Sequence, residues 1–95
     1  MEKSSISVEN VPEGWNKIVL NGDLEKKIGE LNKRTNKVVC LVCNIENVTE
    51  KYVGVLDRVG NSPKGVLYQI KDSYDGVDFE YIEVEDIKEI YTDFD

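Results

Sequence analysis

The segment "KVVCLVCNI" (residues 37–45) is nearly all apolar and rich in β-branched residues. A run of this length and composition is typical of a central β-strand that is buried on both faces. After it, the apolar residues recur with a period of two, which predicts four more strands, over residues 50–59, 66–72, 78–84 and 89–94. Because successive strands usually pair with each other, we expect an antiparallel sheet of five strands.

Turn signals lie between the expected strands. Asp75-Gly76 marks a hairpin tip, and Gly54, inside a strand pattern, indicates a bulge or a sharp bend. Towards the end the apolar spacing becomes three, at Val84, Ile87 and Ile90, which predicts one turn of 3₁₀ helix between the last two strands. A strongly bent meander of this size is expected to close into a small barrel over residues 37–94.

A helix is expected ahead of the strands, over residues 23–35. Asp23 is a favourable N-cap, and Leu24, Ile28 and Leu31 form one apolar stripe at helical spacing. Residues 1–20 are harder to interpret and are expected to form a poorly defined arm, with a short strand pattern at 15–20. The sequence therefore predicts one domain, residues 1–95, of α+β and mainly β class, with the helix packed on the barrel.

The segment "YIEVEDIKEI" (residues 81–90) gives the spacing Y-I-x-V-E-D-I-x-x-I across the expected 3₁₀ turn. With the preceding helix and strands, it resembles the Sm-like or SH3-like small barrels of bacteria, including YolD-like proteins and small acidic Sm-like inhibitors of Rho-dependent termination. The resemblance covers residues 23–94 as a pattern, and motif identity is confined to 81–90. Sm-like barrels often pair edge strands into rings. The nucleotide pocket of RNA-binding Sm proteins has no counterpart here, so the resemblance does not imply RNA binding.

Charge is distributed unevenly along the chain of 95 residues, whose formal net charge is −7. Residues 72–95 carry ten acidic residues and one basic residue, Lys88, and this segment would repel a phosphate backbone. The sequence has neither a run long enough to span a bilayer nor a signal-peptide pattern. We therefore expect a cytoplasmic protein without membrane contact, and the bias toward Asn, Lys, Ile, Glu and Tyr suggests a bacterial or phage origin.

Catalytic and metal-binding patterns receive little support. There is no His, which removes the commonest general base and the commonest metal ligand. Cys40 and Cys43 form a C-x-x-C pair, but strand alternation sends them to opposite faces, so we interpret them as buried small hydrophobes. Around Gly76, Lys71 and Ser73 stand where a calcium loop needs acidic ligands. We expect no enzyme activity, no metal and no cofactor.

The acidic C-terminal segment is the candidate functional site. In a strand over 78–84, Phe79, Tyr81 and Glu83 share one face, and Glu80, Ile82 and Val84 share the other. These acids are interleaved with packing residues, which favours an exposed acidic border over a catalytic carboxylate pair. Such a border can simply discourage edge-to-edge aggregation, or it can attract a basic protein surface.

The leading hypothesis is a non-catalytic acidic protein-binding module that regulates or adapts a larger bacterial or phage partner, in its sharpest form as a DNA mimic. The alternative is a nucleic-acid-binding small barrel that uses the basic face of the helix. We expect a monomer or a homodimer. The predicted partner-binding residues are Tyr74, Asp75, Asp78, Glu80, Tyr81, Glu83, Glu85, Asp86 and Glu89; those of the alternative are Lys26, Lys27, Lys33, Arg34 and Lys37.

Overall fold

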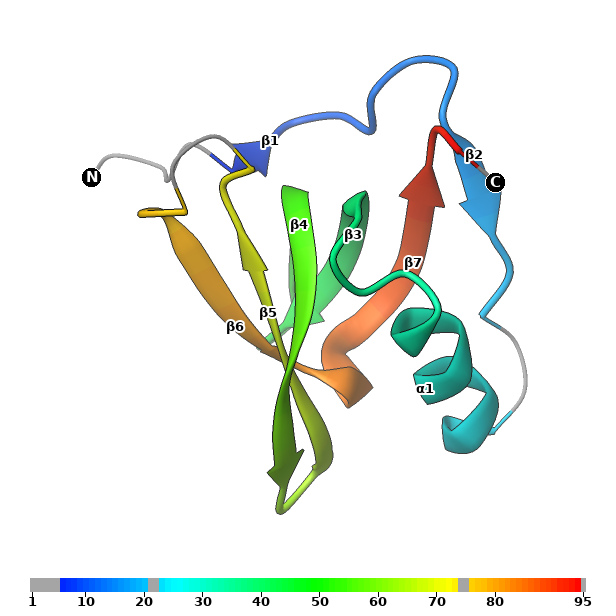
Figure 1. Cartoon of the computed structure of the whole chain (residues 1–95), viewed down its shortest axis with the longest axis vertical. Coiled ribbons are helices and arrows are strands. Elements are labelled where there is room, and N and C mark those ends of the chain that lie inside the picture. The colour runs from blue at the N-terminus through cyan, green and yellow to red at the C-terminus, as the bar shows by residue number, and fades with distance from the viewer. Residues whose placement is uncertain (1–5, 21–22, 74–75, 95) are drawn as a thin grey trace.

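The structure is a computed structural model that describes residues 6–20, 23–73 and 76–94. These residues form one antiparallel sheet with one α-helix and a single 3₁₀ turn (Figure 1). The elements in chain order are β1 (Ser7–Val8), β2 (Asn16–Ile18), α1 (Leu24–Asn32), β3 (Val38–Ile45), β4 (Val48–Ser62), β5 (Gly65–Lys71), β6 (Phe79–Glu83), η1 (Val84–Asp86) and β7 (Ile87–Thr92). The prediction of a mainly β chain with one helix before an antiparallel sheet is confirmed.

The sheet has the strand order β2-β7-β3-β4-β5-β6, and β1 pairs with β4 beside this path. Two expectations about it are wrong. In the described residues the sheet has seven strands instead of five, and its end strands β2 and β6 are not paired, so it is not closed into a barrel. The two additional strands, β1 and β2, have two and three residues and pair with distant parts of the chain. β2 lies within the short strand pattern expected at 15–20.

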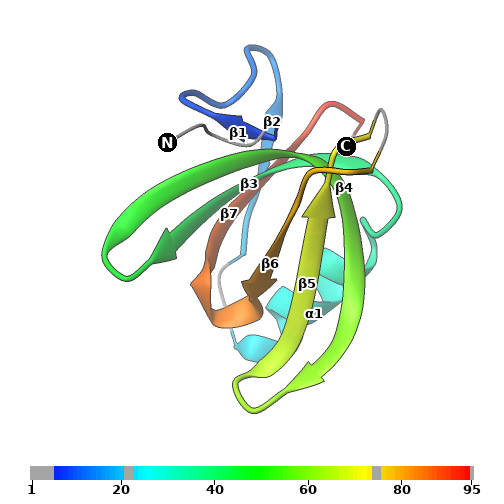
Figure 2. The same cartoon turned by 90° about the vertical axis from the view of Figure 1, so that its left-hand side faces the viewer.

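Strand β4 is long, and its two halves pair with different neighbours in the sheet. Its residues from Val48 to Val55 pair with β3, and those from Val55 to Ser62 pair with β5. Figure 2 shows β4 curving over from one hairpin to the other. Of the two alternatives predicted at Gly54, a bulge or a sharp bend, the bulge lies elsewhere, between Arg58 and Gly60, where the pairing with β5 shifts register. Gly54 instead lies beside Val55, where β4 changes its partner from β3 to β5.

Gly54 has a different role at this curve. A Cβ atom at Gly54 would collide with the backbone carbonyl oxygen of Lys71 and would lie 3.1 Å from Cγ1 of Ile70. The glycine therefore allows β4 to approach the end of β5 more closely than any side chain would permit.

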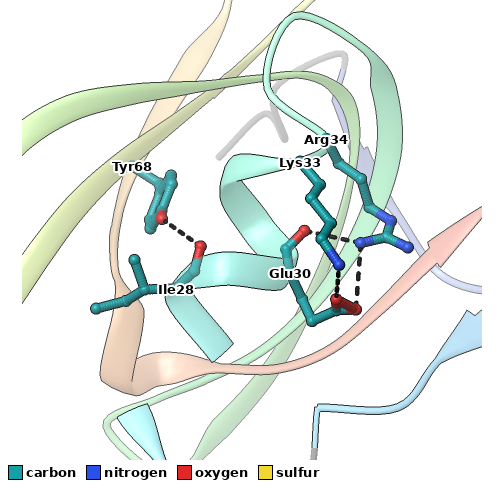
Figure 3. Close-up of polar contacts among 5 residues, drawn as sticks. All are labelled: Ile28, Glu30, Lys33, Arg34 and Tyr68. Atoms are coloured by element: carbon teal, nitrogen blue, oxygen red, sulfur yellow. Dashed lines mark hydrogen bonds and ion pairs between the residues drawn. The ribbon is translucent and has the colours of Figure 1, made fainter. Parts of the chain in front are cut away.

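The core lies on the concave face of the bent sheet, against α1. Leu31 of α1 is fully buried, and Ile28 packs against the same cluster. The Tyr68 hydroxyl, on β5, donates a hydrogen bond of 2.7 Å to Oδ1 of Asn32. It also donates a longer one, of 3.5 Å, to the backbone oxygen of Ile28 (Figure 3). The buried core residues from the sheet include Val39, Leu41, Leu56, Ile70, Ile82 and Ile90. Among the described helical residues, none forms a helix long and apolar enough to cross a bilayer.

The two cysteines of β3 are both buried and both free thiols. Cys43 belongs to the core cluster with Val39 and Leu41, whereas Cys40 is buried outside it. Burial raises the pKa of the Cys40 thiol to about 11 and that of Cys43 to about 12. The prediction that strand alternation places these thiols on opposite faces as small hydrophobes is confirmed.

Candidate protein-docking surface

Strand β6 is an end strand of the sheet, and it carries an exposed aromatic pair. Phe79 is 43% exposed and Tyr81 is 55% exposed, and their rings stack edge to face with 5.2 Å between centroids. Both side chains project from the outward face, because the residues that alternate with them include Ile82, which is buried in the core. Large aromatic side chains placed together in solvent are unusual, since burial of a ring normally stabilises the fold.

Three acidic residues accompany this pair on the same strand or directly before it: Asp78, Glu80 and Glu83. Glu83 lies on the outward face with Tyr81 and accepts a hydrogen bond of 2.5 Å from the Ser62 hydroxyl. Glu80 lies on the other face, close enough to Tyr52 that its charge adds to burial in raising the pKa of that phenol to about 12. The strand therefore presents negative charge on both sides of its backbone. We call Phe79, Tyr81, Asp78, Glu80 and Glu83 the β6 surface.

The rest of the predicted acidic site lies elsewhere. Glu85 and Asp86 are in η1, and Glu89 is on β7, which is not a neighbour of β6 in the sheet. Tyr74 and Asp75 lie outside the described residues. The structure therefore places four of the predicted residues, Asp78, Glu80, Tyr81 and Glu83, on or directly before β6 and puts Glu89 on a different strand. Glu85 and Asp86 follow directly in η1, where they and Glu83 all lie near Lys64.

Two of the separated acids form ion pairs. Glu85 lies 3.3 Å from Nζ of Lys64, and Glu89 lies 2.7 Å from Nζ of Lys17. The hydrogen bond from Lys17 lowers the pKa of the Glu89 carboxyl, and the Tyr91 hydroxyl also donates to it. These acids are therefore partly neutralised within the chain.

The basic residues of the alternative hypothesis are also largely engaged. The Arg34 side chain is buried, and Nη1 donates a hydrogen bond of 2.8 Å to the backbone oxygen of Glu30 and lies 3.5 Å from its carboxylate. Lys33 contacts the same carboxylate at 3.0 Å (Figure 3). Nζ of Lys37 lies 5.0 Å from the centroid of the Phe94 ring.

The remaining two lysines of the alternative are on α1. Lys26 is exposed, and burial lowers the pKa of Lys27, which lies near Lys88 and Asp86. In Figure 1, α1 and β6 lie on opposite sides of the molecule, so the basic helix face is well separated from the β6 surface.

Two open hollows flank the segment that follows β2, and no sequence pattern indicated them. One, of about 360 Å³, is lined by Val19, Lys26, Gly29, Glu30 and Lys33. The other, of about 390 Å³, is lined by Lys17, Val19, Leu20, Lys88 and Glu89. Each contains one lysine that is paired with a glutamate, Lys33 with Glu30 in the first and Lys17 with Glu89 in the second. Only the packing of residues 17–20 beside α1 and β7 creates them, so no sequence pattern could reveal them.

Within the described parts of the chain, no group of three or more Cys, Asp or Glu side chains is placed to hold a metal ion. No protein-family model matches this chain, and neither does any curated protein or solved structure.

Proposed function

We propose that this protein is a non-catalytic binding module that docks a partner protein with a basic surface onto the β6 surface. The observation that carries the proposal is the exposed, mutually stacked pair of Phe79 and Tyr81 on an acidic end strand. Aromatic side chains are enriched at the centres of protein interfaces, where they supply most of the binding energy. Flanking carboxylates would attract a basic partner and orient it during the encounter.

The proposed role is to regulate or adapt a larger bacterial or phage protein in the cytoplasm. DNA mimicry receives less support than a local docking surface, because the acidic residues of β6, η1 and β7 are spread over three places. Glu85 and Glu89 are moreover paired with lysines of the same chain. Nucleic-acid binding by the helix receives less support still, because Arg34 is buried against Glu30.

We also propose that the sheet is a variant of the Sm-like or SH3-like small-barrel plan, altered by β1 and β2. Its support is the helix ahead of the strands, the neighbour order β7-β3-β4-β5-β6 and the 3₁₀ turn between β6 and β7. Superposition of an experimental structure on known small barrels tests this proposal.

Photo-crosslinking in a lysate of the source organism, where the salt concentration can be set, tests the proposed function. A benzophenone amino acid replaces Tyr81 in one variant and Val48, which is exposed on the β3–β4 hairpin, in a matched control. We expect a discrete protein adduct at position 81 that is absent at position 48. The adduct should fade when Glu80 and Glu83 are changed to lysine, and also when the salt concentration is raised to about 0.5 M, because salt screens exposed charges. An adduct that is equally strong at both positions, or one insensitive to salt and charge reversal, contradicts the proposal.

A further inference from the structure

We propose that the partner binds as an added β-strand: an extended basic segment pairs in antiparallel fashion with the outer edge of β6. This inference rests on the proposed function and specifies the form of the partner. Strand addition uses main-chain hydrogen bonds for affinity and alternate side chains for specificity.

The alternation of β6 residues between those that bond to β5 and those that point outward supports strand addition. The backbone N–H of Asp72 donates to the carbonyl oxygen of Asp78 at 2.8 Å, and the register continues from Lys71 opposite Phe79 to Leu67 opposite Glu83. Antiparallel pairs alternate between bonded and non-bonded. After the bonded pair at Asp78, the bonded residues of β6 are Glu80 and Ile82. The N–H groups of Phe79, Tyr81 and Glu83 and the C=O groups of Phe79 and Tyr81 therefore point away from β5, toward the outer edge, whereas Glu83 is the N-cap of η1 and its C=O belongs to that turn.

The other long strands of the described chain are paired on both sides over part of their length. The second half of β4, from Asp57 to Ser62, pairs with β5 alone, but it carries Arg58 and a register shift of the kind that blunts an edge. β7 lies between β3 and β2, β3 between β7 and β4, and β5 between β4 and β6. The first half of β4 has β3 on one side and β1 on the other. The opposite end strand, β2, has only three residues and includes Lys17, and a short edge with a lysine resists strand addition. β6 is the end strand that provides five residues for pairing.

Charge complementarity identifies the occupant as a basic segment. A second copy of the chain on β6 would bring two strands together that each carry Glu80 and Glu83, and like charges close together across paired strands are destabilising. A strand with alternating arginines would instead place them beside Phe79, Tyr81 and Glu83, because directly opposed residues share a face. Arginine can pair with Glu83 and lie over the exposed aromatic rings. The intervening residues would lie beside Glu80 and the buried Ile82, where a β-branched apolar side chain fits.

The probe for this inference is a short capped peptide that alternates arginine and valine. Amide hydrogen exchange of the isotope-labelled protein is measured by NMR with and without the peptide. We expect the amide protons of Phe79, Tyr81 and Glu83 to exchange about tenfold more slowly, because they become hydrogen-bonded. The amide protons of Glu80 and Ile82, already bonded to β5, should change much less. Unchanged exchange at Phe79, Tyr81 and Glu83 with the peptide at saturation would overturn the inference.

Backbone methylation of the peptide separates strand pairing from simple charge attraction. In antiparallel addition the arginines lie directly opposite the outward-pointing residues of β6, so their N–H groups donate to β6. Methylation of the arginine backbone nitrogens keeps every charge but should weaken binding at least tenfold, whereas methylation of the valine nitrogens should have little effect. Equal binding of the parent and the arginine-methylated peptide would overturn strand addition.

A protein variant provides an independent check. Tyr81→Pro removes one outward N–H, and proline is tolerated on an edge whose N–H faces solvent. Compared with Tyr81→Ala, which also lacks the ring, Tyr81→Pro should bind the parent peptide about tenfold more weakly, since one main-chain hydrogen bond is lost. Circular dichroism tests whether both variants are folded. If Tyr81→Pro does not fold, the comparison of the methylated peptides still tests strand addition.

The failures of the two proposals are distinguishable. One outcome is that both methylated peptides bind like the parent and that Glu83→Lys weakens the binding of all three peptides. This outcome supports docking at the β6 surface and contradicts only strand addition. If the crosslinking adduct at position 81 resists charge reversal, the proposed function itself falls.

Discussion

Gly54 is a position where the sheet leaves no room for a side chain. Its hypothetical Cβ collides with the backbone of Lys71, which cannot move without disturbing the pairing of β4 with β5. We predict that Gly54→Ala lowers the free energy of unfolding by about 1–3 kcal/mol or more, as overpacking of a rigid site does. Urea denaturation followed by circular dichroism measures the change.

Gly29 is the matched control for this substitution. It lies within α1, and a Cβ atom there would have no neighbour within 4 Å. Gly29→Ala should therefore stabilise the fold by up to about 1 kcal/mol, because alanine favours the helix. Equal effects of the two alanines would show that β4 does not depend on the close approach at Gly54.

The ion pair between the side chains of Lys17 and Glu89 links β2 to β7. Lys17 lowers the pKa of Glu89, so the folded-state pKa lies below the unfolded value of about 4.3. The stabilisation is therefore present above the unfolded pKa and is lost as the pH falls through the folded pKa. We predict that Glu89→Gln lowers the Tm near neutral pH and that this difference shrinks toward acid pH, as the pH falls below the unfolded pKa and through the lowered folded-state pKa. A Tm difference that does not shrink at acid pH would contradict this assignment.

At the scale of single elements, β3 determines how the two thiols behave. Since the thiolate is the reactive form, the raised pKa values of Cys40 and Cys43 should make both thiols unreactive in the folded protein. We predict that labelling with a disulfide reagent near pH 8 is slower by about two orders of magnitude in the native state than in guanidinium. Rapid native labelling, or an intramolecular Cys40–Cys43 disulfide formed without unfolding, would contradict the assignment to opposite faces.

The contact between α1 and β5 depends on one buried hydroxyl. The Tyr68 hydroxyl bonds to Oδ1 of Asn32 and thereby links the end of the helix to the sheet. Tyr68→Phe should cost about 0.5–1.5 kcal/mol, the usual loss for one buried hydrogen bond. Tyr81→Phe, at an exposed ring on β6, should stay within about 0.5 kcal/mol of the wild type. Urea denaturation of both variants tests the difference.

The helix and the long strands could be predicted from the sequence because their signals are local. Residues 37–45 are nearly all apolar, as in a strand buried on both faces. Asp23 caps the helix by accepting a hydrogen bond from the Lys26 N–H. β1 was not predicted, and β2 was anticipated only as a short strand pattern at 15–20, because the strands that they join, β4 and β7, lie far along the chain. For the same reason the closed barrel was wrong, since nothing local shows that β2 occupies the edge of β7.

The candidate site was predictable only in part. Alternation correctly separates Tyr81 and Glu83 from Ile82, which is why the outward face of β6 could be described from the sequence. The ion pairs of Glu85 and Glu89 involve Lys64 and Lys17, which are distant in sequence, so the sequence did not show which acids are partly neutralised. The buried position of Arg34 likewise follows from tertiary packing and not from its place in a basic run.

At the scale of the whole molecule, the arrangement of edges opposes assembly into rings. A head-to-tail ring needs two different surfaces on each copy, and a strand-paired ring would join β6 of one copy to the outer edge of β7 in the next. β2 already pairs with that edge of β7, from Asn16 opposite Thr92 to Ile18 opposite Ile90. An isologous pairing of β6 with β6 is opposed by its acids.

We therefore predict a monomer of 10.8 kDa by size-exclusion chromatography with light scattering. The double substitution Glu80→Gln and Glu83→Gln should promote dimers at high protein concentration, because it removes the charge that opposes edge pairing. Glu25→Gln together with Glu46→Gln, exposed positions away from β6, is the control for loss of charge alone and should leave a monomer. A wild-type ring would contradict the assignment of the β7 edge to β2.

The pairing of β2 with β7 also determines when β2 can join the sheet during translation. Asn16 leaves the ribosome early, whereas Thr92 is synthesised more than seventy residues later. Throughout that interval the nascent chain must carry β2 without the strand that it will join. Completion of this sheet therefore awaits the end of translation of β7, and in a chain halted before Ile87 the segment Asn16–Ile18 would lack its partner strand.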